Sequence, residues 1–280
     1  MSLRAFAAAW LAAGTLMPAP ILVHGHRGAR AVRPENTMAA FEYAITAGVD
    51  VLELDLAVTK DNVLVASHDP VLNRKICRGP QGMSTVIREL TLDQVRQFDC
   101  GSIPNPDYRK QQPVAGARVP ALDEVFALAG RGAFEFNIET KIFRDKPRYT
   151  PPPEVFALLV LEAIRRHRLE SRVIVQSFDF RTLAAMKKLD ARIRLAALIE
   201  RPWQDFVKSA REAGATIISP QYRLVTREKV EAAHEAGLEV VAWTANEAKQ
   251  WDALIAARVD AIISDDPAEL IVYLKKRGLK

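Results

Sequence analysis

Two carboxylates, Glu53 and Asp55, stand two residues apart within the apolar run 51–56. In a β-strand this spacing places both side chains on one face. Carboxylates that share a desolvated place repel each other unless a cation lies between them. Glu139, which ends another apolar run, adds a third, and three carboxylates without thiolates suit a hard divalent ion such as Ca²⁺ or Mg²⁺. These three are the predicted metal ligands. The alternative is an outward-facing pair that forms salt bridges with helical Lys or Arg.

The chain has five histidines, and two of them, His26 and His68, follow apolar runs. Cleavage of a phosphodiester needs a base for the nucleophile and an acid for the leaving group, and histidine serves both roles near neutral pH. We therefore expect His26 and His68 to be the catalytic pair, without an assignment of which is the acid. For either residue alone, the alternative is a structural hydrogen bond.

Arg27 and Lys141 are cations next to these residues in the sequence. An arginine fork binds two phosphate oxygens and a lysine acts as a point charge, so both are predicted phosphate ligands. The alternative is that they only neutralise the carboxylates. The ring of Trp243, which also ends an apolar run, is expected to lie against the carbons of a small polyol, with its indole N–H left for a hydroxyl. A tryptophan of the core is the alternative.

Short apolar runs alternate with amphipathic stretches along the chain, and most candidate residues lie at the ends of the runs. Continuous, β-branched runs are typical of buried parallel strands; they cover residues 21–25, 51–56, 63–67, 134–138, 173–176, 193–198, 216–219, 240–243 and 261–264. The stretches between them predict helices at 37–47, 153–167, 180–189, 204–213, 226–236, 245–257 and 267–276.

This alternation predicts an α/β fold, specifically a (β/α)8 TIM barrel with an insertion after the second strand. Run 63–67 follows the tight-turn pair Asp61-Asn62, so we interpret it as a hairpin return that leaves eight barrel strands. An open doubly wound sheet is the alternative. Active sites of such barrels lie at the C-terminal ends of the strands, which is where the candidate residues are expected.

The 280 residues, 49% of them hydrophobic and 26% charged, are enough for one large core. Residues 1–19 resemble a signal peptide, because Arg4 precedes an apolar stretch too short to span a bilayer. The barrel domain is then 20–280, and the protein is periplasmic or secreted. If the segment instead packs on the barrel as an apolar helix, the protein is cytoplasmic.

Segment 70–120 is rich in Pro, Gly, Asn and Asp and carries one short predicted helix, 92–98. Long insertions of this kind tend to shape a site. Cys77 and Cys100 lie in it, outside any CxxC pair and too few for a zinc site. In an exported protein they would close a disulfide loop; two buried free thiols are the alternative.

The formal net charge of +5 favours an anionic partner, or is simply a solvated basic surface. Lys and Arg are scattered and no nucleic-acid-binding motif is present, so a small-molecule substrate is expected rather than nucleic acid. No stable membrane span is expected, and the sequence does not specify the oligomeric state.

Taken together, the motifs resemble those of the glycerophosphodiester phosphodiesterase family over roughly Val23 to Pro267. The matching segments are His26-Arg27-Gly28, Pro34-Glu35-Asn36-Thr37, Glu53-Leu54-Asp55, Thr59-Lys60-Asp61, His68-Asp69, Asn137 to Lys141, Gln176-Ser177-Phe178, Trp243 to Asn246 and Ser264 to Pro267. The order is specific as a set, although no single segment is. Asn62 replaces the usual turn glycine and Ala245 a common valine.

The resemblance implies a (β/α)8 barrel that hydrolyses glycerophosphodiesters to glycerol 3-phosphate and an alcohol. It implies Glu53, Asp55 and Glu139 as ligands of a divalent metal ion, His26 and His68 as the acid–base pair, and Arg27 and Lys141 as phosphate ligands. Glu35 would be a nearby supporting residue. The alternative function is a phospholipase-type phosphodiesterase that acts on lysophospholipids or inositol phospholipids, and a barrel that only binds its ligand is a further alternative.

Overall fold

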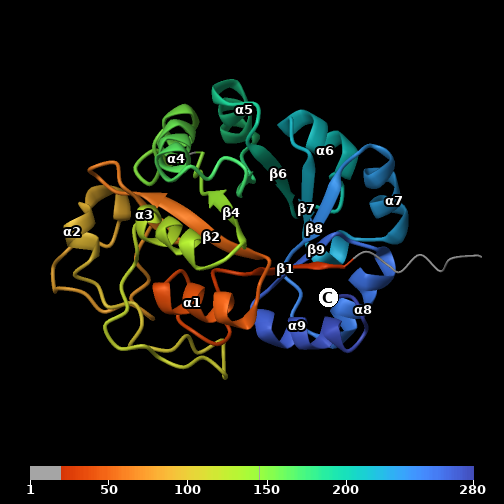
Figure 1. The fold of residues 1–280 in the computed structure, drawn as a ribbon. Helices are drawn as coiled ribbons and strands as arrows, with labels where there is room; N and C mark the ends of the chain where they lie inside the picture. Colours follow the sequence, from red (N-terminus) through yellow and green to blue (C-terminus); the bar gives the residue numbers. More distant parts are fainter. Residues whose placement is uncertain (1–19, 145) are drawn as a thin grey trace, which may run out of the picture.

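The computed structural model describes residues 20–144 and 146–280, which form a closed parallel barrel surrounded by helices (Figure 1). Strand β1 pairs with both β2 and β9, and this pairing closes the barrel. The eight barrel strands are β1 (Leu22–Gly25), β2 (Val51–Val58), β4 (Glu135–Thr140), β5 (Val173–Ser177), β6 (Arg194–Ile199), β7 (Ile217–Pro220), β8 (Glu239–Ala242) and β9 (Ala261–Ser264). The predicted (β/α)8 barrel is confirmed. The predicted signal peptide, residues 1–19, lies outside the described residues and stays a prediction.

The ninth strand, β3 (Leu64–Ala66), returns antiparallel along the end of β2, as expected for a hairpin. Asn62 lies in the turn before it with a φ of 60°, in the left-handed region. Asparagine adopts this conformation more readily than most residues, which explains why it replaces glycine here.

Several helices outside the barrel begin and end at recognisable cap residues, and α1 is an example. Thr37 accepts a hydrogen bond from the Ala40 N–H at the start of α1, and Gly48 ends α1 in the left-handed conformation. The helices are α1 (Met38–Ala47), α2 (Leu92–Val95), α3 (Leu122–Phe126), α4 (Pro153–His167), α5 (Phe180–Leu189), α6 (Phe206–Ala213), α7 (Arg227–Glu235), α8 (Ala248–Ala257) and α9 (Pro267–Lys275), with 3₁₀ turns at Ile87–Glu89, Ala127–Arg131 and Tyr222–Leu224. Helix α3 was not predicted, and α8 begins three residues later than expected because Glu247 is its N-cap.

Successive side chains of each strand point alternately into the barrel and toward the layer of helices. Leu52, Leu54 and Leu56 of β2 belong to the large core between the strands and the helices, whereas Glu53 and Asp55 point into the barrel. Below them a small apolar cluster fills the barrel toward the N-terminal ends of the strands; it consists of Ile174, Ala196, Ile217, Val241, Ala261 and Ile263. This plug makes the interior a packed core rather than a pore, and the acidic cluster lies on its C-terminal side.

The insertion between β3 and α3 has a hydrophobic core of its own, built from Leu72, Ile87, Val95, Phe98 and β3 residue Val65 among others. Cys77 and Cys100 form a disulfide within it, so the predicted pairing is confirmed and the alternative of two free thiols is wrong. Gln111 then fixes the insertion to the barrel, because its side-chain amide donates to the carbonyl oxygens of Arg30 and Arg33 at 2.7 and 3.2 Å. The loop after β1 and the insertion are therefore one connected structure.

No helix within residues 20–144 and 146–280 is both long and apolar enough to cross a bilayer.

Replacing both Cys77 and Cys100 with serine should lower the free energy of unfolding by about 3 kcal/mol. The disulfide joins residues 23 positions apart and so reduces the conformational entropy of the unfolded chain. Denaturant unfolding of the oxidised wild type and the double variant measures this difference. The wild type under reducing conditions is the matched control and should resemble the variant. Equal midpoints for all three samples would contradict the expectation.

Candidate active site

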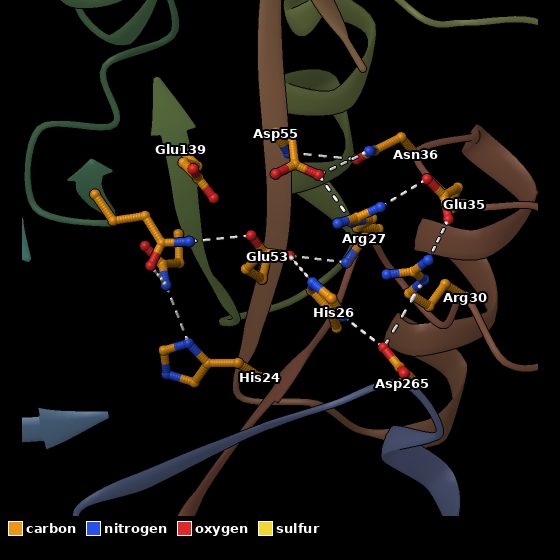
Figure 2. Close-up of polar contacts among 12 residues, drawn as sticks. His24, His26, Arg27, Arg30, Glu35, Asn36, Glu53, Asp55, Glu139 and Asp265 are labelled. Carbon is orange, nitrogen blue, oxygen red and sulfur yellow. Dashed lines mark hydrogen bonds and ion pairs between the residues drawn. The ribbon is translucent and has the colours of Figure 1, made fainter. Parts of the chain in front are cut away.

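The three predicted metal ligands meet inside the barrel near the C-terminal ends of β2 and β4 (Figure 2). Strand pairing sets Asp55 beside Glu139, and Glu53 lies one inward position below Asp55. Each residue offers one carboxylate oxygen, and these three oxygens lie within 4.8 Å of one another. All three side chains are buried. The sequence therefore placed the cluster correctly, on two adjacent strands.

Electrostatics within the cluster favour a bound cation. Burial and the Asp55 carboxylate raise the pKa of Glu53 well above its usual value, and burial raises the pKa of Glu139 despite the nearby Lys141. Burial also acts to raise the pKa of Asp55, but Lys141 and Arg27 outweigh it and hold that pKa well below its usual range. An oxygen-only donor set with mutual repulsion fits a hard divalent ion, whose charge would keep all three carboxylates ionised.

Arg27 reaches this cluster because the chain turns sharply after β1. Arg27 has a φ of 49° and Gly28 a φ of 81°, and a Cβ atom on Gly28 would lie 2.6 Å from the carbonyl carbon of Ala40. The turn directs the Arg27 N–H to a Glu53 carboxylate oxygen at 2.8 Å. It also brings the guanidinium Nε to 3.0 Å from Asp55 Oδ2. A left-handed arginine costs about 1 to 2 kcal/mol, which these contacts offset.

Charged and polar residues around Arg27 hold its side chain in place. Glu35 forms ion pairs with Arg27 and Arg30 at 2.8 and 3.0 Å, as Figure 2 shows for the three labelled residues. Asn36, itself at a φ of 53°, donates from its amide to Asp55 at 3.0 Å. Glu35 was expected near the site, whereas Arg30 and Asn36 were given no role. Asn36 stands in the matched segment Pro34-Glu35-Asn36-Thr37, which was its one sequence signal, and Arg30 lies outside the matched segments.

His26 is oriented by a second set of hydrogen bonds. Its Nδ1 lies 2.5 Å from Asp265 Oδ1, and its Nε2 lies 4.0 Å from Glu53 Oε2. Asp265 also accepts from the Asn246 amide at 2.7 Å and from the Tyr108 hydroxyl of the insertion at 3.3 Å. Burial acts to raise the pKa of Asp265, but His26, Arg30 and the Asn246 amide lower it to about 2. Burial lowers the pKa of His26, an effect that Asp265 offsets only in part.

His68 follows β3, and its side chain is more exposed than that of His26, 36% against 13%. Its Nδ1 lies 2.8 Å from Asp69 Oδ1. His26 and His68 both line a cavity of about 290 Å³ that also contains Glu53, Glu139 and Arg27; we call it the barrel cavity. The predicted histidine pair thus shares one cavity with two of the predicted metal ligands, Glu53 and Glu139, and the third, Asp55, lies beside Glu139.

Lys141 and Trp243 line the barrel cavity as well. The Lys141 ammonium lies 2.7 Å from Glu139 and 3.1 Å from Asp55, and the two carboxylates raise its pKa against the effect of burial. Trp243 packs edge-on against Phe178 with ring centroids 5.5 Å apart. Its indole N–H donates to the Ser219 carbonyl at 2.8 Å. The expectation of a free indole N–H was therefore wrong, since a backbone acceptor of the barrel uses it.

His24, whose role the sequence left open, lies below the acidic cluster in a buried polar layer. Burial lowers its pKa to about 3, so the ring is neutral. The Asn137 amide lies 3.4 Å from His24 Nδ1 and donates to Gln176 at 3.0 Å, and Gln176 donates in turn to Glu53 at 3.0 Å. This chain of amides supports the carboxylates from beneath.

The fold and the site define a (β/α)8 barrel whose C-terminal end carries an acidic metal-type cluster, two histidines and two cations, a combination suited to an anionic substrate. The chain matches the model of the glycerophosphoryl diester phosphodiesterase family over residues 26–269. It is 33% identical to a glycerophosphodiester phosphodiesterase of Caldanaerobacter subterraneus subsp. tengcongensis, over 92% of this chain and 99% of the relative. A glycerophosphodiester phosphodiesterase of Bacillus altitudinis is 31% identical over 88% and 94% of the two chains.

The solved structure of a family protein from Silicibacter pomeroyi DSS-3 superposes with a TM-score of 0.88 at 29% identity, covering 94% of this chain and 96% of that one. These similarities extend over nearly the whole barrel rather than one motif. The chain therefore belongs to the glycerophosphoryl diester phosphodiesterase family and is an enzyme, a phosphoric diester hydrolase.

The Asp265→Asn variant should titrate at His26 with a pKa lower than that of the wild type, because the carboxylate raises this pKa and an amide does not. Side-chain NMR titration of the histidines in the metal-free protein measures the shift. His234, which lies 2.9 Å from Asp260 on the outside of the barrel, is the internal control and should not move. An unchanged or higher His26 pKa would show that Asp265 is not the dominant polar partner.

Proposed function

We propose that this enzyme hydrolyses glycerophosphodiesters to glycerol 3-phosphate and an alcohol, with a divalent metal ion held by Glu53, Asp55 and Glu139. The observation that carries the proposal is a cluster of three buried carboxylates, two of which line one cavity together with two histidines and the cations Arg27 and Lys141. The relatives that cover nearly the whole chain bear this activity in their names. The size of the barrel cavity, about 290 Å³, suits a small polar substrate.

A divalent ion in the acidic cluster would supply positive charge to the phosphate and to the charge that develops during attack. Ca²⁺ and Mg²⁺ both suit the all-oxygen donor set. Arg27 and Lys141 add to this field from the two sides of Asp55, each within 3.1 Å of that carboxylate. Because each cation is fixed by carboxylates before substrate binds, little reorganisation is needed when the phosphate arrives.

The two histidines move the protons in the proposed reaction. One accepts a proton from the nucleophile, either water or the glycerol hydroxyl adjacent to the phosphate, as the new P–O bond forms. The other donates a proton to the leaving alkoxide as the old P–O bond breaks. With its Nδ1–H donated to Asp265, the neutral His26 ring carries an unprotonated Nε2, which suits it to accept a proton. The glycerol hydroxyl route passes through a cyclic phosphate that water then opens.

The barrel cavity also bears on how the glycerol end binds. The Trp243 ring and Phe178 form an apolar wall on one side of the cavity. The carbons of glycerol would lie against this wall, and the hydroxyls would face the polar side.

We expect the enzyme to cleave glycerophosphocholine, with release of glycerol 3-phosphate, faster than it cleaves lysophosphatidylcholine. Preferential cleavage of the lysophospholipid would favour the phospholipase-type activity instead.

His26→Ala and His68→Ala should each lower kcat for glycerophosphocholine by at least about 10²-fold, because each removes one proton-transfer group. Steady-state kinetics with saturating metal measure the loss. His234→Ala, on the outer helix α7, is the matched control and should stay within about twofold of the wild type. Wild-type turnover in both site variants would refute the acid–base assignment.

Treatment with EDTA should abolish activity, and added Ca²⁺ or Mg²⁺ should restore it. Glu139→Gln removes one of the three carboxylates and should weaken binding of the restoring ion at least about tenfold in calorimetric titration of the metal-free enzyme. Glu135→Gln is the matched control, since Glu135 begins the same strand at the far end of the barrel and pairs with Arg194. Equal affinities of the two variants for the ion would place the metal elsewhere.

A further inference from the structure

A second cavity, of about 380 Å³, lies beneath the insertion next to the barrel cavity. We call it the insertion cavity. Arg27, Arg30 and His68 line both cavities, so the two spaces meet at the residues that would surround the phosphate. A phosphodiester bound there has two organic arms. If glycerol occupies the barrel cavity, the leaving alcohol extends into the insertion cavity.

The fixed charges of the insertion cavity are unevenly compensated. Its two arginines, Arg27 and Arg30, both form ion pairs with Glu35. Two further carboxylates, Asp69 and Asp107, line the same cavity from exposed positions. Asp69 is paired only with His68, and Asp107 forms no ion pair within the part of the chain that the structure describes. An occupant of this cavity away from the phosphate therefore meets mainly negative charge.

The other residues that line the insertion cavity are of two kinds: apolar side chains at its base, and the side-chain amides of two asparagines. Leu72, Val119 and the Cys77–Cys100 disulfide are buried beneath it. The side-chain oxygens of Asn73 and Asn105 accept hydrogen bonds from the backbone N–H groups of Lys75 and Asp107. An apolar base below exposed carboxylates suits a small alcohol that carries both carbon atoms and a positive charge.

We propose that the insertion cavity binds the leaving alcohol and that Asp107, with Asp69, selects an ammonium-bearing alcohol such as choline or ethanolamine over a neutral polyol. This inference rests on the proposed function, because it assigns the leaving-group end of the same substrate. Asp107 lies near the surface, where charge attraction is screened by water, so the expected selectivity is about three- to tenfold.

The experiment compares kcat/KM for glycerophosphocholine with kcat/KM for glycerophosphoglycerol, whose leaving alcohol is neutral. Asp107→Asn should lower this ratio about three- to tenfold, and Asp107→Lys should lower it further. The effect should shrink at high salt, because an exposed charge is screened. The matched control is Asp93→Asn, an exposed acid of the same insertion that does not line the cavity, and its ratio should equal that of the wild type.

Equal ratios for the wild type and both Asp107 variants would overturn the inference while leaving the phosphodiesterase activity intact. A ratio that changes as much in Asp93→Asn would overturn it too, because the effect would then come from net charge. A wild-type enzyme that cleaves neither substrate nor bis(p-nitrophenyl) phosphate would overturn the proposed function itself, and the inference with it.

Discussion

Three carboxylates buried at one end of a β-barrel are the constraint on which the rest of this structure depends. The ionised forms of Glu53, Asp55 and Glu139 are costly to remove from water, and they repel one another. The barrel supplies two compensating cations: the Arg27 guanidinium pairs with Asp55, and the Lys141 ammonium pairs with Asp55 and Glu139. Among the residues that the structure describes, Glu53 accepts hydrogen bonds from two neutral donors, the Arg27 N–H and the Gln176 amide, and from no cationic side chain. A divalent ion would complete the charge balance that the protein leaves open.

Much of the surrounding architecture positions groups against this cluster. The left-handed turn at Arg27 and Gly28 brings a backbone N–H and a guanidinium to two different carboxylates at once. The amide chain from His24 through Asn137 and Gln176 links the polar layer below to Glu53. Above the cluster, the insertion reaches back through Tyr108 to Asp265, the partner of His26. The insertion thus contributes to the orientation of a histidine as well as to the shape of the opening.

The sequence predicted the parts of this arrangement that follow from side-chain alternation along a strand and from position at the C-terminal end of a strand. Alternation on β2 placed Glu53 and Asp55 on one face, and the rule for barrel strand ends brought Glu139, His26 and Lys141 to the same opening. It did not predict Tyr108, Asn246 or Arg30, because their contacts join segments far apart in the chain and no local pattern reports such pairings. The expectation that the Trp243 indole N–H is free for substrate was also wrong, because it donates to the Ser219 carbonyl of the neighbouring strand β7. Helix α3 was missed because it follows directly on a Pro-rich insertion.

Anomalous diffraction from crystals soaked in Mn²⁺ tests the central claim most directly, since this ion prefers the same oxygen ligands as Mg²⁺ and scatters anomalously. We predict one strong peak within bonding distance of carboxylate oxygens from Glu53, Asp55 and Glu139. A peak bound by other residues, or full Mn²⁺-dependent activity with no peak among these carboxylates, would contradict the account.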